Sequence, residues 1–307
     1  MTDASRALPS PSTTPIAASS KAPAEVGRRR PIRRLLIALT VGYAVYLAAM
    51  FFLQGAILFP RHFAGHALPS ETAPAGTQVL WLEPEPGVRV EAWLLPPMRE
   101  ATAPAGLAVF FHGNGELIEH NLPVAAEYQR RGFWVLLPEY RGYGRSTGTP
   151  GERAIVADMQ ALITRALASA PIDSAKMILH GRSLGGGVAA QVAGAMSEQG
   201  RAPRALVLES TFVSITAMAA RRGVPAPLLR DPFRTDRVLP TLTFPILVAG
   251  SPDDELIPFS NSRELVTLNP RARLHENGGR HNSFPTDWGA FWTAIDALLG
   301  EAGLSGE

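Results

Sequence analysis

A short glycine-flanked segment, residues 181–185, has the residue types and spacing of a serine nucleophile. It reads Gly-Arg-Ser-Leu-Gly, and it lies between an apolar run at 176–180 and a run of small residues with helical character. This order predicts a strand, a sharp turn and a helix. Such a nucleophile elbow raises the hydroxyl of Ser183 above the edge of a sheet. The flanking glycines let the strand and the helix pass closely, because they carry no Cβ.

A serine hydroxyl is a weak nucleophile at neutral pH, so it needs a base that takes its proton and an acid that orients the base. The apolar run 245–250 ends in an acid-rich loop, as expected at the carboxyl edge of a parallel sheet, where such sites lie. We predict Asp254, in an Asp-x-x-Ile-Pro arrangement, as the acid and keep Asp253 as the alternative acid. Glu255 is expected to face solvent.

Two histidines follow this loop, and they have different surroundings. His275 lies in the alternating run 273–276, which indicates a strand side chain. His281 lies in a glycine-rich turn before the last helical stretch, and such a turn can bring an imidazole over the elbow. We therefore predict His281 as the base.

The tetrahedral intermediate of acyl transfer needs backbone N–H groups for its oxyanion. We expect one from Leu184, which directly follows the nucleophile, and one from Asn114, in the loop after the apolar run 107–111. An ordinary glycine turn is the alternative interpretation of that loop. His112 is expected to be a structural hydrogen-bonding residue.

Other chemistries fit the sequence poorly. A serine at position 183 is not the carboxylate nucleophile of dehalogenases or epoxide hydrolases, and no glycine-rich turn continues into the Gly-Lys-Ser/Thr of a phosphate-binding loop. The chain has no cysteine, and His112 and His120 have no acid at metal-ligand spacing, so we expect neither a metal nor a cofactor. Residues 1–34 carry seven Lys/Arg and two acids, while the remainder is mildly acidic, so nucleic-acid binding is not expected.

Residues 35–59 contain no charged side chain and are long enough to cross a hydrocarbon core of about 30 Å. We predict a transmembrane signal anchor here. A cleaved signal peptide or a buried core helix is the alternative; the run exceeds the usual apolar region of a signal peptide and lacks a small-x-small site. By the positive-inside rule, residues 1–34, a predicted disordered basic tail, are cytoplasmic and the following domain lies across the membrane. The flanking charges are Arg28, Arg29, Arg30, Arg33 and Arg34 before the segment and Arg61 after it.

The rest of the chain alternates strand-like and helical runs, which predicts an α/β fold with a mostly parallel sheet of about eight strands covered by helices. The predicted organisation is a linker at 60–76, a catalytic domain at 77–302 and a C-terminal tail at 303–307. Two initial strand runs without a helix between them predict an antiparallel hairpin. Strand runs are expected at 79–82, 89–95, 107–112, 134–138, 176–180, 205–209, 246–249 and 273–276, and helices near 117–131, 151–169, 185–199, 212–222, 260–268 and 287–299.

These motifs together resemble the membrane-anchored α/β-hydrolases of the Bem-forty-six type, which are related in motif order to lysophospholipases and protein depalmitoylases. The resemblance implies an α/β-hydrolase fold and a Ser–Asp–His triad. It also implies a glycine-rich turn at 141–146 beside the active site, supported by Arg141. One departure keeps Asp253 open: the spacing from Gly250 to Asp254 is one residue longer than usual. The matching stretches are 57–60, 111–115, 139–146 with Gly148, Pro150 and Glu152, then Asp158, 208–212, 254–258, Gly279 and His281.

The sequence therefore predicts a serine hydrolase that cleaves carboxylic esters or thioesters of small-molecule or lipid acyl substrates through an acyl-enzyme on Ser183. The stretch 211–243, where related folds insert a cap, is short, so a minimal cap and an open pocket are expected. A serine peptidase on the same fold and a non-catalytic hydrolase-like binding module are the alternatives. Richness in Ala, Arg and Pro suggests a bacterium with a GC-rich genome, and hence a single-pass inner-membrane protein with a periplasmic domain.

Overall fold

The computed structural model describes residues 29–65, 67–69, 72–98 and 105–304. The chain divides into two compact units, residues 1–48 and residues 49–307. Most of the predicted basic tail and the end of the predicted C-terminal tail, residues 1–28 and 305–307, lie outside the described residues. Within the described part, residues 30–63 contain one helix long and apolar enough to cross a membrane, with a mean hydropathy of 2.2 over 18 residues. A signal sequence near the N-terminus meets the same criteria of length and composition.

Helix α1 (Arg29–Leu58) extends across the boundary between the two units. In the first unit its apolar side chains are exposed, as at Leu35 and Val45, which are 60% and 63% exposed. The chain after α1 packs within the second unit. A short 3-10 helix, η1 (Arg61–Phe63), follows α1, and Phe59 and Ala64 are buried in the core of that unit.

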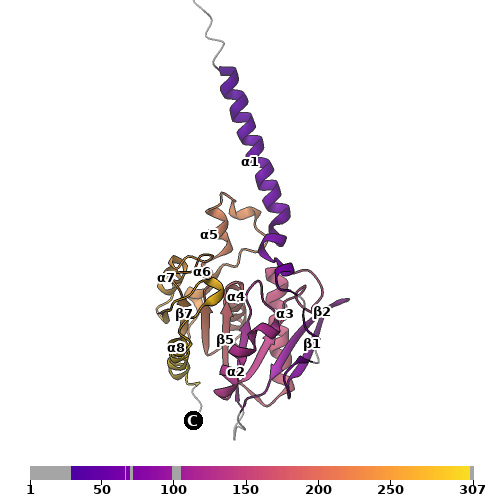
Figure 1. Cartoon of the computed structure of the whole chain (residues 1–307), viewed down its shortest axis with the longest axis vertical. Coiled ribbons are helices and arrows are strands. Elements are labelled where there is room, and N and C mark those ends of the chain that lie inside the picture. Colours follow the sequence, from indigo (N-terminus) through magenta and orange to yellow (C-terminus); the bar gives the residue numbers. More distant parts are fainter. Residues whose placement is uncertain (1–28, 66, 70–71, 99–104, 305–307) are drawn as a thin grey trace, which may run out of the picture. The chain divides into compact units, whose positions relative to one another are not determined.

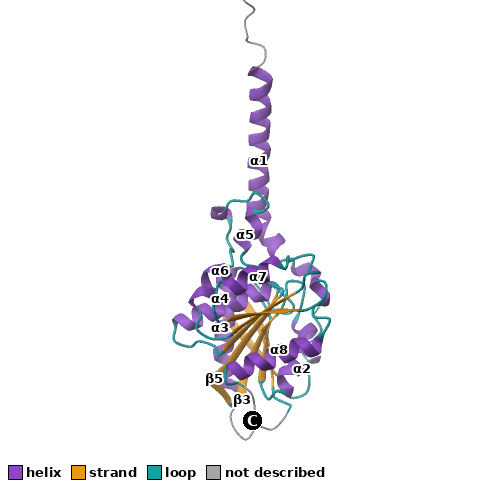
Figure 2. Cartoon of the chain, turned by 90° about the vertical axis from the view of Figure 1, so that its left-hand side faces the viewer, coloured by secondary structure: helices purple, strands orange, loops and turns teal. Residues whose placement is uncertain are grey.

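In the described residues, eight strands form a single sheet in the order β1-β2-β4-β3-β5-β6-β7-β8. Figures 1 and 2 show this sheet from two directions. The pairs β1–β2 and β2–β4 are antiparallel and the others are parallel. This confirms the predicted mostly parallel sheet and its entry hairpin. The strands are β1 (Gln78–Glu85), β2 (Val88–Leu95), β3 (Ala105–Phe111), β4 (Trp134–Pro138), β5 (Ile172–Arg182), β6 (Ala205–Glu209), β7 (Ile246–Gly250) and β8 (Ala272–Glu276).

Helices cover both faces of this sheet (Figure 2). Successive residues of a strand point to opposite faces, so Val109 and Phe111 pack in one buried cluster while Ala108 and Phe110 pack in the other. The first cluster includes residues of α3 and α4, and the second includes residues of α2 and α8. The helices are α2 (Leu122–Arg130), α3 (Glu152–Ser169), α4 (Leu184–Glu198), α5 (Ile215–Ala220), α6 (Thr235–Val238), α7 (Ser260–Thr267) and α8 (Trp288–Glu301).

The strand order reverses direction between β3 and β5. From β3 the chain moves outward to β4, and from β5 it moves the other way through β6, β7 and β8. In open α/β sheets, the crevice at the carboxyl ends of strands beside such a reversal is the usual binding site. The segments after β3, β5, β7 and β8, which carry every predicted site residue, therefore converge at this edge.

Candidate active site

Ser183 occupies the sharp turn between β5 and α4, in a backbone conformation that L-residues rarely adopt. Its φ is 53° and its ψ is −118°. Such a conformation costs free energy and persists where its surroundings hold it. Here the N–H of Ser183 donates to the Glu209 carbonyl at 2.8 Å, and the Ser183 carbonyl accepts from the Thr211 hydroxyl at 2.6 Å and from the Gly186 N–H at 3.0 Å. Hydrogen bonds to the backbone N–H and carbonyl of Ser183 therefore hold this residue in its conformation.

Glycine is required on both sides of this turn. A Cβ at position 181 would lie 2.1 Å from the Gly185 carbonyl oxygen. A Cβ at position 185 would lie 2.0 Å from the carbonyl oxygen of Phe111, at the end of the neighbouring strand β3. The close passage that the motif predicted therefore involves β3 as well as β5 and α4.

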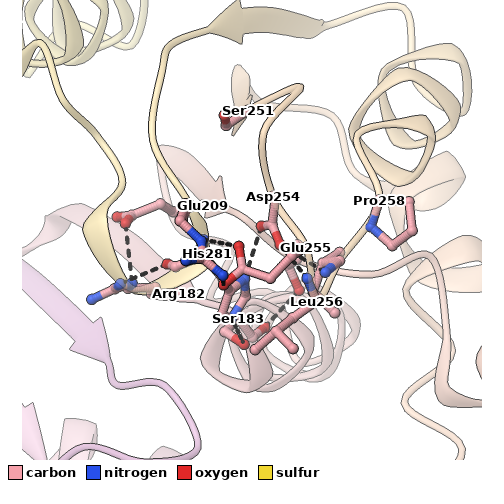
Figure 3. A network of polar contacts seen from close by, with 12 residues as sticks. Arg182, Ser183, Glu209, Ser251, Asp254, Glu255, Leu256, Pro258 and His281 are labelled. Carbon is pink, nitrogen blue, oxygen red and sulfur yellow. Dashed lines mark hydrogen bonds and ion pairs between the residues drawn. The ribbon is translucent and has the colours of Figure 1, made fainter.

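The structure brings Ser183, His281 and Asp254 into a hydrogen-bonded series (Figure 3). His281 Nε2 lies 2.9 Å from Ser183 Oγ, and His281 Nδ1 lies 2.8 Å from Asp254 Oδ2. His281 and Asp254 are both buried, at 6% and 8% exposure. An imidazole held by a carboxylate at Nδ1 presents its other nitrogen to the hydroxyl as a proton acceptor.

The local turn decides which aspartate faces His281. Asp254 Oδ1 accepts the N–H groups of Leu256 at 2.9 Å and Ile257 at 2.8 Å, which directs this carboxylate inward. Asp253 is exposed, and its N–H donates to the Ser251 hydroxyl at 3.0 Å. The structure therefore does not bring the alternative acid to the imidazole.

The backbone of His281 is held on both sides by charged side chains. Its N–H donates to Glu255 Oε2 at 3.1 Å, and its carbonyl accepts from Arg182 Nη2 at 2.9 Å. The first of these hydrogen bonds, assisted by Arg280, lowers the pKa of Glu255. Glu255 is exposed, as expected, yet it still contacts the site. Neither contact was predictable from the sequence, because neither residue belongs to a motif that predicts a partner far along the chain.

The loop after β3 presents Asn114 to the same site. The N–H groups of Asn114 and Leu184 donate to no acceptor among the described residues, and both residues line, with Ser183, a cavity of about 380 Å³. The Asn114 side chain is fixed at both ends: Nδ2 donates to the Leu58 carbonyl at 2.6 Å, and Oδ1 accepts from the Tyr143 hydroxyl at 2.5 Å. Two N–H groups beside a serine hydroxyl are suited to bind a developing oxyanion.

The buried side chain of His112 contacts the backbone of this loop. Its Nδ1 lies 2.8 Å from the Gly113 carbonyl oxygen and its Nε2 lies 2.7 Å from Glu139 Oε1, so both ring nitrogens face acceptors. Burial acts to lower the pKa of His112, but the charge and hydrogen bond of Glu139 outweigh it, and the pKa lies above its usual value. The ring also stacks on Tyr140, with centroids 4.1 Å apart.

The glycine-rich turn after β4 is held by a buried ion pair. Arg141 Nε and Nη2 donate to the two carboxylate oxygens of Asp158 at 2.6 and 2.7 Å, and Arg141 Nη1 donates to Glu85 at 2.7 Å. Tyr143, from the same turn, donates its hydroxyl to Asn114 Oδ1. Among the described residues, no three His, Asp or Glu side chains are placed to hold a metal ion.

Known proteins resemble this chain in sequence. Residues 102–238 match a family model described as serine aminopeptidase, S33. The Arabidopsis thaliana α/β-hydrolase domain-containing protein WAV2 is 32% identical over 199 residues, 58% of this chain. The uncharacterized protein YfhR of Escherichia coli K12 is 29% identical over 189 residues, 59% of this chain. This chain spans 62% and 64% of the lengths of those two relatives, slightly less than two thirds. The uncharacterized protein Rv2307c of Mycobacterium tuberculosis H37Rv is 30% identical over 218 residues, which cover 69% of this chain and 75% of that protein.

Solved structures share the fold. The apo form of Thermogutta terrifontis esterase 2 superposes with a TM-score of 0.63 at 17% identity, covering 78% of this chain and all of that one. Est1E from Butyrivibrio proteoclasticus, solved with ferulic acid, superposes with a TM-score of 0.60 at 16% identity, covering 73% of this chain and 99% of that one. At this level of identity, the likeness concerns the arrangement of the strands and helices.

Proposed function

This chain belongs to the α/β-hydrolase family, and we propose that it hydrolyses carboxylic esters or thioesters of acyl substrates with Ser183 as nucleophile. The observation that carries the proposal is the series Ser183–His281–Asp254, with contacts of 2.9 and 2.8 Å. It lies beside a cavity lined by Asn114 and Leu184, whose N–H groups have no acceptor among the described residues. Esterases among the solved structures with the same fold agree with this reaction class.

In the proposed acylation step, Ser183 Oγ attacks the carbonyl carbon of the substrate while its proton passes to His281 Nε2. The Asp254 carboxylate stabilises the imidazolium, and the N–H groups of Leu184 and Asn114 bind the oxyanion. When the intermediate collapses, the bond to the leaving oxygen or sulfur breaks, and His281 returns the proton to the departing alcohol or thiol.

In the deacylation step, a water molecule gives a proton to His281 and attacks the acyl carbon on Ser183. The second tetrahedral intermediate expels Ser183 Oγ, which regains a proton from His281, and the carboxylic acid leaves. The net reaction consumes one water, and it needs neither a metal nor a cofactor.

The family model's description as an aminopeptidase makes peptide hydrolysis the second candidate. An aminopeptidase holds the substrate's amine with acidic side chains. Here Asp231 is the acid that lines the cavity among the described residues, and its carboxylate accepts the Glu152 N–H at 2.7 Å. Most other lining residues are apolar, which favours an acyl ester over a charged amine.

Labelling with a fluorophosphonate probe tests the nucleophile. We expect wild-type protein to be labelled, and we expect Ser183→Ala to lose both the label and, by about 10⁵-fold or more, the hydrolysis of p-nitrophenyl butyrate. Ser169→Ala, at the exposed end of α3, is the control and should behave as wild type. Folded wild-type protein that neither labels nor hydrolyses esters would falsify the proposal and favour a binding module.

For the location, we propose that α1 is an uncleaved signal anchor in a bacterial inner membrane with the catalytic domain in the periplasm. Two observations support this topology. The apolar side chains of α1 before residue 46 are exposed. Arginines at positions 28–30, 33 and 34 flank the N-terminal side of the apolar segment. In intact cells, a periplasmic domain resists externally added protease until the outer membrane is permeabilised. A mature protein that has lost the mass of residues 1–59 would instead indicate a cleaved signal peptide.

A further inference from the structure

Part of the lining of the cavity beside Ser183 is formed by residues that precede the predicted catalytic domain in the sequence. The last turns of α1 line it with Met50, Phe51, Ile57 and Leu58, and these residues belong to the same compact unit as the domain. A second part of the lining comes from α5 and the segment after it, with Ile215, Met218, Ala219, Leu228 and Leu229. The cavity is therefore apolar on two sides and reaches the proposed nucleophile.

Hydrogen bonds hold the last turns of α1 against the segment that contains Leu228. Gln54 uses both ends of its amide: Nε2 donates to the Leu228 carbonyl at 3.1 Å, and Oε1 accepts the Arg230 N–H at 2.8 Å. Arg230 Nη2 donates to the Phe51 carbonyl at 3.0 Å, and its guanidinium lies 4.6 Å from the centre of the Phe51 ring. Gln54, the most polar side chain of the apolar segment 35–59, therefore helps to hold this part of the lining in place.

The same turns also contact the proposed oxyanion loop, through the hydrogen bond from Asn114 Nδ2 to the Leu58 carbonyl. The end of α1 therefore contacts both the loop that would bind the oxyanion and the segment after α5 that lines the cavity. A substrate carbonyl on Ser183 would have its acyl substituent next to these side chains.

We propose that this cavity holds the chain of a medium- or long-chain fatty acyl ester or thioester. Met50, Phe51 and Leu58 of α1 then determine the preferred chain length. This inference rests on the proposed function. The flexible side chains of Met50, Met218 and the leucines suit an unbranched chain that bends. Burial of a methylene favours binding by about fourfold, so kcat/KM rises with acyl length until the cavity is filled.

The test measures kcat/KM of the full-length chain in lipid nanodiscs for p-nitrophenyl esters from acetate to dodecanoate. We expect a rise with acyl length in the wild-type enzyme. We expect Met50→Trp, which places bulk in the cavity from α1, to lower the ratio of decanoate to acetate hydrolysis at least tenfold. Ala219→Phe, which adds bulk from α5, should lower the same ratio. Phe52→Trp is the matched control on α1, because Phe52 is 75% exposed and does not line the cavity.

A second series, with alkyl acetates of increasing alcohol length, separates the acyl side from the leaving-group side. A length dependence found in the alcohol series and not in the acyl series overturns the assignment. A flat acyl profile, or an unchanged ratio in both Met50→Trp and Ala219→Phe, overturns it as well. Fluorophosphonate labelling keeps the two proposals apart: a labelled enzyme with a flat profile refutes only the acyl pocket, and wild-type protein without label or ester hydrolysis refutes both.

Discussion

The guanidinium of Arg182 donates a hydrogen bond to the backbone carbonyl of His281, with Nη2 and the oxygen 2.9 Å apart. Arg182 directly precedes Ser183, and its other nitrogens face Glu116 Oε1 at 2.7 Å and Glu209 Oε1 at 3.4 Å. The strand that carries the proposed nucleophile is thereby connected to the loop that carries the proposed base. Arg182 touches neither Ser183 Oγ nor the imidazole, so its role is that of a positioning residue.

Replacing Arg182 with Met should lower kcat by about 10- to 100-fold, because a hydrogen bond from a charged donor contributes about 1.5–3 kcal/mol. KM should change little, since Arg182 does not line the cavity. Arg182→Lys keeps a charged donor and should recover part of kcat. Steady-state kinetics on a butyrate ester measure both parameters, with Arg165→Met on the exposed side of α3 as control. An increase in KM at unchanged kcat would contradict a positioning role.

A second prediction compares Asp254 with Asp253. The Asp254 carboxylate contacts His281, whereas the Asp253 side chain is exposed. Asp254→Asn removes the charge that stabilises the imidazolium and favours the wrong tautomer of His281, so kcat should fall by about 10⁴-fold. Asp253→Asn alters an exposed side chain and should leave kcat within about twofold. Single-turnover acylation rates of the two variants provide the comparison. If Asp253→Asn were the slower enzyme, the proposed acid would be misassigned by one residue.

The sequence was sufficient to predict the features that depend on local pattern. The elbow around Ser183 follows from its spacing of glycines, and the strand runs follow from apolar residues bounded by turn residues. The start of α5 was missed by three residues, because the Ser214 hydroxyl accepts the Ala217 N–H and caps the helix there. The choice between Asp253 and Asp254 depended on which carboxylate the turn directs inward.

Contacts between segments that are far apart in the chain leave no pattern in the sequence from which they could be predicted. The hydrogen bond from Arg182 to His281 joins residues 99 positions apart, and the one from Gln54 to Leu228 joins residues 174 apart. From the sequence, Arg182 is known only as a member of the elbow motif, and residues 50–58 only as part of the predicted membrane segment. Arg182 and Gln54 each contact a partner that only the folded chain brings near, so tertiary packing adds information that the local pattern lacks.

The pair His112–Glu139 makes a prediction about pH. The pKa of His112 is raised in the folded state, so the protonated imidazole contributes stability that is complete below about pH 6.5 and is lost as the pH rises through the folded-state pKa. The gap in denaturation midpoint between wild type and His112→Asn should therefore be larger at pH 6 than at pH 9. Tryptophan fluorescence during urea unfolding measures it, with the exposed His62→Asn as control. A gap that widens with rising pH would reverse the assigned sign.

Gly185 allows a direct test of the close passage at the elbow. A Cβ at this position would lie 2.0 Å from the Phe111 carbonyl oxygen and 2.6 Å from that of His112, so Gly185→Ala must displace α4 from the end of β3. We expect a loss of about 3 kcal/mol or more, which lowers the Tm by about 6–12 °C in a domain of this size. Because the displacement of α4 reorients the Leu184 N–H relative to Ser183 Oγ, the rate of fluorophosphonate labelling should fall as well.

Gly289→Ala is the matched control for this substitution. Gly289 also lies within the first residues of a helix, α8, but the atom nearest to its added Cβ is Asp287 Oδ1 at 3.4 Å, an ordinary contact. Alanine is the better helix former, so this variant should keep or slightly raise the Tm and should label at the wild-type rate. Differential scanning fluorimetry and a labelling time course on both variants complete the comparison. Equal Tm values for the two variants would mean that the elbow tolerates a Cβ, contrary to the geometry of β3, β5 and α4.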